Sequence, residues 1–172
     1  MYDRPVSAAN DVHGDGIAFL LTQLGHDAAT RFAEQMATID LSPPHAGILR
    51  TIAAEPGGSQ QALSARLGVL PSRVVAYVDE LEERGYVERR RNPDDRRLHA
   101  LHLTASGKRL MRKISTLASE HEGNMTSGLD ERQRGTLREL LATLAQQRGL
   151  TPHVHPGYRT LGHANGSTTP AG

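Results

Sequence analysis

The chain has 172 residues, a formal net charge of +1, 37% hydrophobic residues and no cysteine. The absence of cysteine excludes disulfide bonds, thiolate metal sites and cysteine nucleophiles. The near-neutral charge gives no bulk positive field, so any surface for nucleic acid has to be local. No apolar run approaches the ~20 residues that span a bilayer, and the N-terminus has no secretory pattern. These features predict a cytoplasmic protein with no membrane partner.

Polar segments flank an apolar body. Residues 1–15 carry no periodicity, and residues 149–172 are rich in Gly, Pro, Thr and His. Because neither segment has the apolar content that offsets ordering entropy, both are expected to be disordered. Between them, apolar residues recur at helical spacing from Ile17 to Ile39, which predicts a long amphipathic helix.

Three shorter helices follow, each marked by cap and turn residues. Their expected limits are Ser42-Pro43 to Ala54, Ser59 to Gly68, and Pro71 to Gly85. The last two are short helices joined by a tight turn that contains glycine. This arrangement is typical of a helix-turn-helix, in which the first helix braces the second in the DNA major groove.

The pattern then changes from helix to strand. Residues 86–90 and 98–103 have strand character and flank a turn cluster, which predicts a two-stranded hairpin with a basic tip. Thr104 is expected to cap a fifth helix, and Asp130 with Gln133 forms a capping box for a sixth. The predicted fold is therefore mainly α with a small β-hairpin wing.

The order of elements divides the chain into a DNA-binding and a pairing region. Residues 42–104 are expected to form a winged helix-turn-helix domain, and the helices of 16–41 and 105–148 a dimerisation region. The apolar seams of these long helices have no role in a lone winged domain, so pairing with a second copy is the economical interpretation. The alternative is that they complete the core of a monomer.

Candidate DNA contacts lie on the second short helix and on the wing. Arg73 is suited to bidentate contact with guanine, and Val75 and Ala76 to thymine methyl groups. Arginine at a hairpin tip can enter a narrow minor groove, and an aspartate two positions before it can orient the guanidinium. The alternative in both places is an ordinary solvated charge. The predicted contacts are Ser72, Arg73, Val75, Ala76, Arg89, Arg90, Arg91, Asp95, Arg96 and Arg97.

The stretch LEERGYVERRRNPDDRRLHALHLTASGK, which starts at Leu81, resembles the wing signature of the MarR family of regulators. The shared pattern is Leu-Glu-x-x-Gly-x-Val-x-Arg, then Asp-x-Arg, then Leu-Thr-x-x-Gly. The upstream QALSARLGV is similar to the bracing helix of the family, and the resemblance covers about residues 16–148. It implies that Arg97 is the minor-groove arginine and that Asp95 orients it.

The resemblance also implies an assembly and a mode of control. The terminal helices would interlock into a homodimer that reads a pseudo-palindrome, with half-sites about one helical turn (~34 Å) apart. A small, often aromatic or phenolic, ligand would bind between the dimerisation helices and the DNA-binding lobe and release a repressor. The recognition helix departs from the family pattern because it begins Leu70-Pro71 rather than with a polar cap, so no operator sequence is implied.

Polar candidates for that ligand site are few, and they could equally be surface or inter-helix hydrogen-bonding groups. They are His26, Arg31, His45 and Arg50. The nine histidines raise the alternative of a zinc-responsive regulator, for which His121-Glu122 is the one pairing in an ordered region. Regulatory zinc needs three or four convergent ligands and the sequence names no such set, so no metal ligand and no cofactor are assigned.

The two other classes of protein are an enzyme and a winged domain that binds protein. The chain has no Gly-x-Ser-x-Gly, no His-Glu-x-x-His and no phosphate-binding loop, so no catalytic residue is assigned and no enzyme is expected. A winged domain that binds another protein instead of DNA is the remaining alternative. The sequence thus predicts a regulator of transcription whose partners are double-stranded DNA, a second copy of itself and a small-molecule effector.

Overall fold

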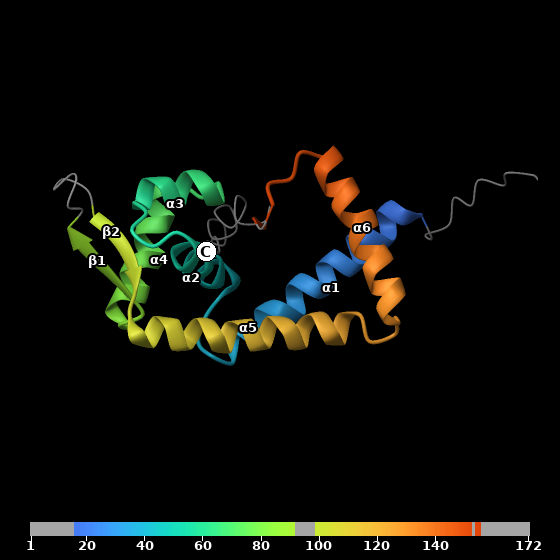
Figure 1. The fold of residues 1–172 in the computed structure, drawn as a ribbon, viewed down its shortest axis with the longest axis horizontal. Coiled ribbons are helices and arrows are strands. Elements are labelled where there is room, and N and C mark those ends of the chain that lie inside the picture. Colours follow the sequence, from blue (N-terminus) through green and yellow to red (C-terminus); the bar gives the residue numbers. More distant parts are fainter. Residues whose placement is uncertain (1–15, 92–98, 153, 156–172) are drawn as a thin grey trace, which may run out of the picture.

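The computed structural model describes residues 16–91, 99–152 and 154–155. Its described part holds six helices and one antiparallel hairpin, which confirms the predicted fold class. Figure 1 shows a winged region at one end, a long helix along the molecule, and two further helices at the other end. No described helix is both long enough and apolar enough to cross a membrane.

The winged region has a helix-helix-helix-hairpin order, and its boundaries follow from local caps. Ser59 accepts a hydrogen bond from the Ala62 N–H at 3.1 Å, which caps α3, and Gly68 ends that helix at φ 62°. Gly85 ends α4 in the left-handed conformation, at φ 70°, that glycine adopts at low cost. The elements are α2 (Pro43–Ala54), α3 (Gln60–Leu67), α4 (Pro71–Glu83), β1 (Val87–Arg91) and β2 (His99–Leu103).

Three longer helices make up the rest: α1 (Ile17–Ala37), α5 (Ala105–Met125) and α6 (Glu131–Gln147). Thr104 accepts a hydrogen bond from the Gly107 N–H at 3.0 Å and so caps α5, as expected. Both bonds of the predicted capping box are present at the start of α6, at 2.8 and 2.9 Å between Asp130 and Gln133. Helix α1 lies against α5, as Figure 1 shows.

The hydrophobic core lies in the winged region and under the first half of α5. It is built mainly from the inward faces of α2, α3, α4 and the hairpin, with Leu110 and Ile114 of α5. In contrast, no residue of α6 is buried, although this helix carries four leucines on one side. The two ends of the molecule therefore differ: one has its own core, and the other exposes an apolar face.

The hairpin is extended by backbone from the loop between α2 and α3. Val87 pairs with Leu103 and Arg91 with His99 across the two strands. On the other edge of β2, the Gly57 N–H donates to the Leu101 carbonyl at 2.9 Å, and the Leu101 N–H donates to the Gly58 carbonyl at 3.0 Å. These bonds fix the hairpin to the helical part of the domain, so the wing has a defined direction.

The segment after α6 turns back toward the winged region in Figure 1. Val154 packs against the hydrophobic core, and its N–H donates to the Thr151 carbonyl at 3.2 Å. The whole of 149–172 was predicted to be a disordered tail, whereas Val154 near its start packs against apolar neighbours. The other expected disordered segment, residues 1–15, lies outside the described residues.

Candidate DNA-binding surface

Helix α4 has one buried face and one open face. Val74, Val78 and Leu81 recur at steps of four and three residues and are fully enclosed by the core. Arg73 is half-buried at the edge of this face. Three of the predicted contacts lie on the exposed side of the first half of the helix, namely Ser72, Val75 and Ala76. The core thus holds the helix while its first two turns remain open to a partner.

Arg89 joins the wing to α4. Its guanidinium forms ion pairs with Asp79 and Glu82, and its backbone N–H donates to Glu82 Oε1 at 3.1 Å. The Arg89 side chain is only 19% exposed. Arg89 was predicted to be a DNA contact with the other wing arginines, but in the structure it has two carboxylate partners on α4. These contacts hold β1 against α4. A direct contact of Arg89 with DNA stays a prediction.

The next two arginines point outward. Arg90 is 60% exposed and is paired with Glu88, two residues before it on the same strand, at 2.5 Å. Arg91 is exposed at the end of β1. The other predicted wing contacts, Asp95, Arg96 and Arg97, lie outside the described residues, so the proposed Asp95–Arg97 pair remains a prediction.

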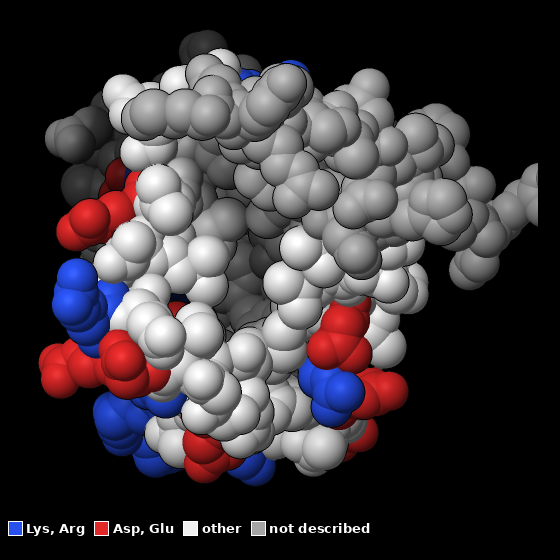
Figure 2. All heavy atoms as spheres, turned by 90° about the vertical axis from the view of Figure 1, so that its right-hand side faces the viewer, with Lys and Arg blue, Asp and Glu red and all other residues white. Residues whose placement is uncertain are grey.

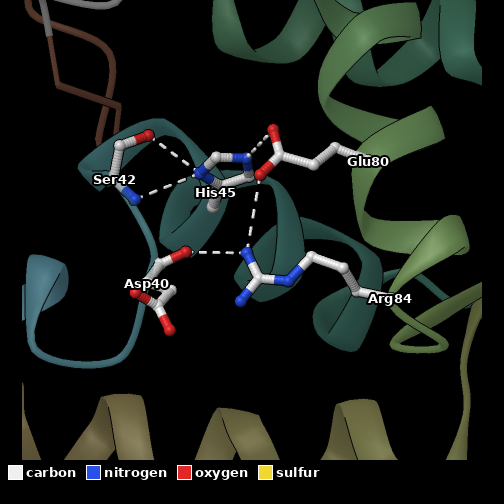
Figure 3. A network of polar contacts seen from close by, with 5 residues as sticks. All are labelled: Asp40, Ser42, His45, Glu80 and Arg84. Carbon is white, nitrogen blue, oxygen red and sulfur yellow. Dashed lines mark hydrogen bonds and ion pairs between the residues drawn. The ribbon is translucent and has the colours of Figure 1, made fainter.

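A polar network joins α4 to the chain between α1 and α2 (Figure 3). His45 Nε2 lies 3.1 Å from Glu80 Oε2. The other ring nitrogen, Nδ1, accepts the Ser42 backbone N–H at 3.1 Å and lies 2.8 Å from Ser42 Oγ. Arg84 Nη1 donates to the Asp40 carbonyl at 2.7 Å and lies 3.5 Å from Glu80 Oε1.

His45 therefore forms a hydrogen bond between α2 and α4. The sequence had left this role open beside that of a ligand contact. Its side chain is 7% exposed, and its ring meets the Tyr77 ring edge-on, with centroids 4.9 Å apart. Burial lowers the pKa of His45, and the adjacent Glu80 carboxylate only partly offsets this effect. The neutral imidazole is thus the form that this site favours.

Glu80, Arg84 and Asp40 were not among the residues predicted from the sequence. The signal was present on α4, where Tyr77, Glu80 and Arg84 recur at steps of three and four residues beside the apolar stripe. Such a row lies at the border of a buried helix face and is well placed to bond a neighbouring element. Their partners lie 35 and 44 positions away in the sequence, so the pattern does not identify them.

The other candidates for a ligand site do not gather around His45. His26 and Arg50 are exposed, and Arg31 is held by Asp27 within α1, with Nε 2.9 Å from both carboxylate oxygens. Their role in binding a ligand remains a prediction.

A cavity of about 210 Å³ lies instead between the end of α2, the hairpin and the start of α5. It is lined by Ile52, Ala53, Pro56, Arg90, His102, Leu103 and Lys108.

The histidine considered for zinc has a packing role. The His121 ring lies 5.5 Å from the Phe32 ring, which joins α5 to α1. Its neighbour Glu122 lies 3.5 Å from Arg138 and connects α5 to α6. Among the residues that the structure describes, no three His, Cys, Asp or Glu side chains come together as a metal site would require.

A bracing helix, an exposed second helix and an arginine-bearing hairpin define a winged helix-turn-helix domain, a class that places its second helix in the major groove. The sequence model of the MarR family matches residues 39–98. A protein of Thauera aromatica, whose assigned role is transcriptional regulation of the hcr operon, is 36% identical over 130 residues. The match covers 74% of this chain and 78% of that protein.

Solved structures show the same fold. The transcriptional repressor CouR, bound to a 23-mer DNA duplex, has 33% identity and a TM-score of 0.66 over 76% of this chain and 92% of that one. Wild-type MarR from E. coli in its apo form has 22% identity and a TM-score of 0.68 over 75% of this chain and 96% of that one. The chain belongs to the MarR family of DNA-binding transcriptional regulators.

Proposed function

We propose that this regulator is a homodimeric repressor that binds a pseudo-palindromic operator and is released by a small molecule. The observation that carries the proposal is the open first half of α4 beside the outward arginines of the wing. In this arrangement Arg73 would read guanine, and Val75 and Ala76 would contact thymine methyl groups, with Ser72 beside them.

The wing would supply the second set of DNA contacts. Arg90 and Arg91 would approach phosphates because both are exposed on β1. Arg97, oriented by Asp95, would enter the minor groove with Arg96 beside it. A net charge of +1 gives little long-range attraction, so affinity would depend on these local contacts and fall steeply with salt.

A second copy of the chain would cover the apolar end of the molecule. Four leucines form a seam on α6, and exposed apolar residues continue on the first half of α1. Among the described residues in Figure 2, uncharged ones border the lower side of the hollow at this end, while charged side chains gather toward the edge of the molecule. The exposed residues are Ile17, Phe19, Leu20, Leu21 and Leu24 of α1 and Leu137, Leu140, Leu141 and Leu144 of α6.

This face is best suited to a second copy because α6 has no buried residue of its own. A helix with an apolar seam gains most of its stability from burying that seam. A two-fold dimer would bring two α4 helices to half-sites about one turn (~34 Å) apart and double the contacts with phosphate.

Repression and release by a small, aromatic ligand complete the proposal. CouR, 33% identical, is a repressor, and the cavity of about 210 Å³ has room for a small molecule.

Selection of bound duplexes from a random-sequence pool tests the proposal. The purified protein should enrich an inverted repeat, and the complex should contain two chains of 18.7 kDa each. Phenolic acids would then be screened for release of the selected duplex. Enrichment of no sequence, or a complex with one chain, would contradict the proposal.

One substitution distinguishes a DNA-binding wing from a winged domain that binds another protein. Arg97→Ala should weaken binding of the selected duplex by roughly 5- to 100-fold. Arg112→Ala, at an exposed position on α5, is the matched control and should change affinity little. Equal affinities for the parent and Arg97→Ala would contradict the proposed wing contact.

A further inference from the structure

The second half of α4 is tied to the chain that leaves α1. Two polar contacts cross this boundary, Glu80 to His45 and Arg84 to the Asp40 carbonyl (Figure 3), beside the ring contact of His45 with Tyr77. Asp40 lies three residues after the end of α1, and His45 lies in the first turn of α2. The contacts therefore connect the recognition helix to the point where a dimerisation helix enters the DNA-binding lobe.

The His45 contact has a defined direction. The Ser42 backbone N–H can only donate, so Nδ1 of His45 must be the acceptor. In the neutral ring the proton is then on Nε2, which donates to Glu80 at 3.1 Å. Since the His45 side chain is 7% exposed and held by α2, it fixes the position of the Glu80 carboxylate.

The Arg84 contact adds a second link to the same turn. Arg84 Nη1 reaches the Asp40 carbonyl at 2.7 Å, and its guanidinium lies 5.4 Å from the centre of the Tyr86 ring. Asp40 is the only described non-glycine residue with positive φ, at 55°. This left-handed residue turns its carbonyl toward Arg84, so the turn after α1 is shaped to meet the recognition helix.

The polar contacts that join the recognition helix to the wing and to the α1–α2 turn lie toward one end of the helix. Asp79 and Glu82 bind Arg89 of the wing, while Glu80 and Arg84 bind the α1–α2 turn. All four lie in the second half of the helix or directly after it. In the first half, Ser72, Val75 and Ala76 are exposed. A change in the second-half contacts would therefore change where the first half points.

We infer that Glu80 and Arg84 are positioning residues that set the angle of α4 to α1, and with it the separation of the two recognition helices on DNA. The inference rests on the proposed dimeric function. It adds that the spacing of half-sites is encoded in these two polar contacts, in addition to the apolar dimer face. Movement of α1 would reach α4 through these two contacts and the ring contact between His45 and Tyr77, because all three join α4 to the segment that follows α1.

The test measures preference for half-site spacing. The parent protein first selects an inverted repeat from a random pool, and duplexes are then made with one or two base pairs added or removed between its half-sites. Affinities of the full-length parent, Glu80→Ala, Arg84→Ala and Glu83→Gln are measured for each duplex and for a single half-site. Glu83 is exposed on the same turn of α4 and serves as the control.

The parent and Glu83→Gln should favour one spacing, and Glu80→Ala and Arg84→Ala should reduce that preference by roughly 5-fold or more. Affinity for the single half-site should stay near that of the parent, because the base contacts are unchanged. Arg84→Lys should keep part of the preference, since its ammonium can still donate to Asp40. If an alanine variant does not fold, Glu80→Met and Arg84→Met, which keep an unbranched side chain but neither accept from His45 nor donate to Asp40, decide the result by the same measure.

The outcomes separate the inference from the function on which it rests. An unchanged spacing preference in the folded variants would overturn the inference alone. An equal loss of affinity at every spacing would also overturn it, because it would indicate a purely structural role. A parent protein with no spacing preference would overturn the dimeric recognition itself.

Discussion

Gly107 lies directly beneath the carbonyl oxygen of Tyr86, so close that a Cβ at position 107 would be 2.0 Å from that oxygen. The same carbonyl accepts the Thr104 N–H at 3.1 Å, and Thr104 Oγ1 donates to the Gly85 carbonyl at 2.7 Å. The start of α5 is therefore in contact with the backbone between α4 and β1. The glycine of the Leu-Thr-x-x-Gly motif is needed for this close approach.

Gly107→Ala should destabilise the fold because a backbone atom, which cannot rotate away, occupies the required space. We expect a loss of about 2–3 kcal/mol in the free energy of unfolding, measured by denaturant titration. Gly123→Ala on the same helix is the control. A Cβ there meets no atom within 4 Å, so that change should stabilise α5 by up to ~1 kcal/mol. Equal stabilities of the two variants would contradict the close packing at Tyr86.

His45 should make stability depend on pH. Burial lowers its pKa in the folded protein, so between the ordinary value of about 6.5 and that lower value the unfolded chain binds more protons. Stability is then lost as the pH falls below about 6.5. The free energy of unfolding should drop less between pH 7.5 and 5.5 in His45→Gln than in the parent, and the exposed His26→Gln should follow the parent. Identical pH slopes in all three proteins would exclude this role of His45.

The leucine seam of α6 should hold the proposed dimer together. Leu140 is 59% exposed in the single chain, and Leu140→Glu would place a charge within the proposed interface. Sedimentation should show a monomer for this variant and a dimer for the parent, with much weaker binding of two-half-site DNA. Gln146→Glu makes the same charge change on the other side of the helix and should remain dimeric. A dimeric Leu140→Glu protein would place the interface elsewhere.

Arg89 and Arg90 are neighbours with different expected roles. Arg89→Ala leaves Asp79 and Glu82 without their shared cation and should cost about 1–2 kcal/mol of stability. Arg90→Ala should change stability by less than about 0.5 kcal/mol because its pair with Glu88 is exposed. It should instead lower the salt dependence of DNA binding by about one phosphate contact. Denaturant unfolding and salt titrations of DNA binding measure both effects for both variants. A larger loss of stability in Arg90→Ala than in Arg89→Ala would contradict these roles.

Local patterns predicted the fold well. The predicted caps at Ser59, Thr104 and Asp130 are confirmed, and each accepts a hydrogen bond from an N–H three residues away. Such caps can be predicted because the bond spans so few residues. The first strand was expected from Tyr86 but begins at Val87. The reason is that the Tyr86 N–H donates to the Leu81 carbonyl at 2.8 Å and closes α4, so it is not available to the strand.

The site was less predictable because its polar contacts join distant segments. The five arginines among residues 89–97 give no sign that Arg89 is paired with α4 while Arg90 points outward. Likewise His45 and His26 are both single histidines within predicted helices, so the sequence does not distinguish them. In the structure, His45 of these two meets a carboxylate from another helix. Which charged groups are used internally depends on packing, whereas the location of the recognition helix follows from periodicity and turns.

The most direct test of sequence-specific recognition by α4 is an equilibrium titration of the parent and Arg73→Ala against the selected duplex and a shuffled duplex of equal length. The parent should prefer the selected duplex by at least ~1,000-fold at physiological salt. Arg73→Ala should lose roughly 5- to 100-fold of that preference and keep its affinity for the shuffled duplex. Equal affinity of the parent for both duplexes, or an unchanged preference in Arg73→Ala, would contradict this recognition by α4.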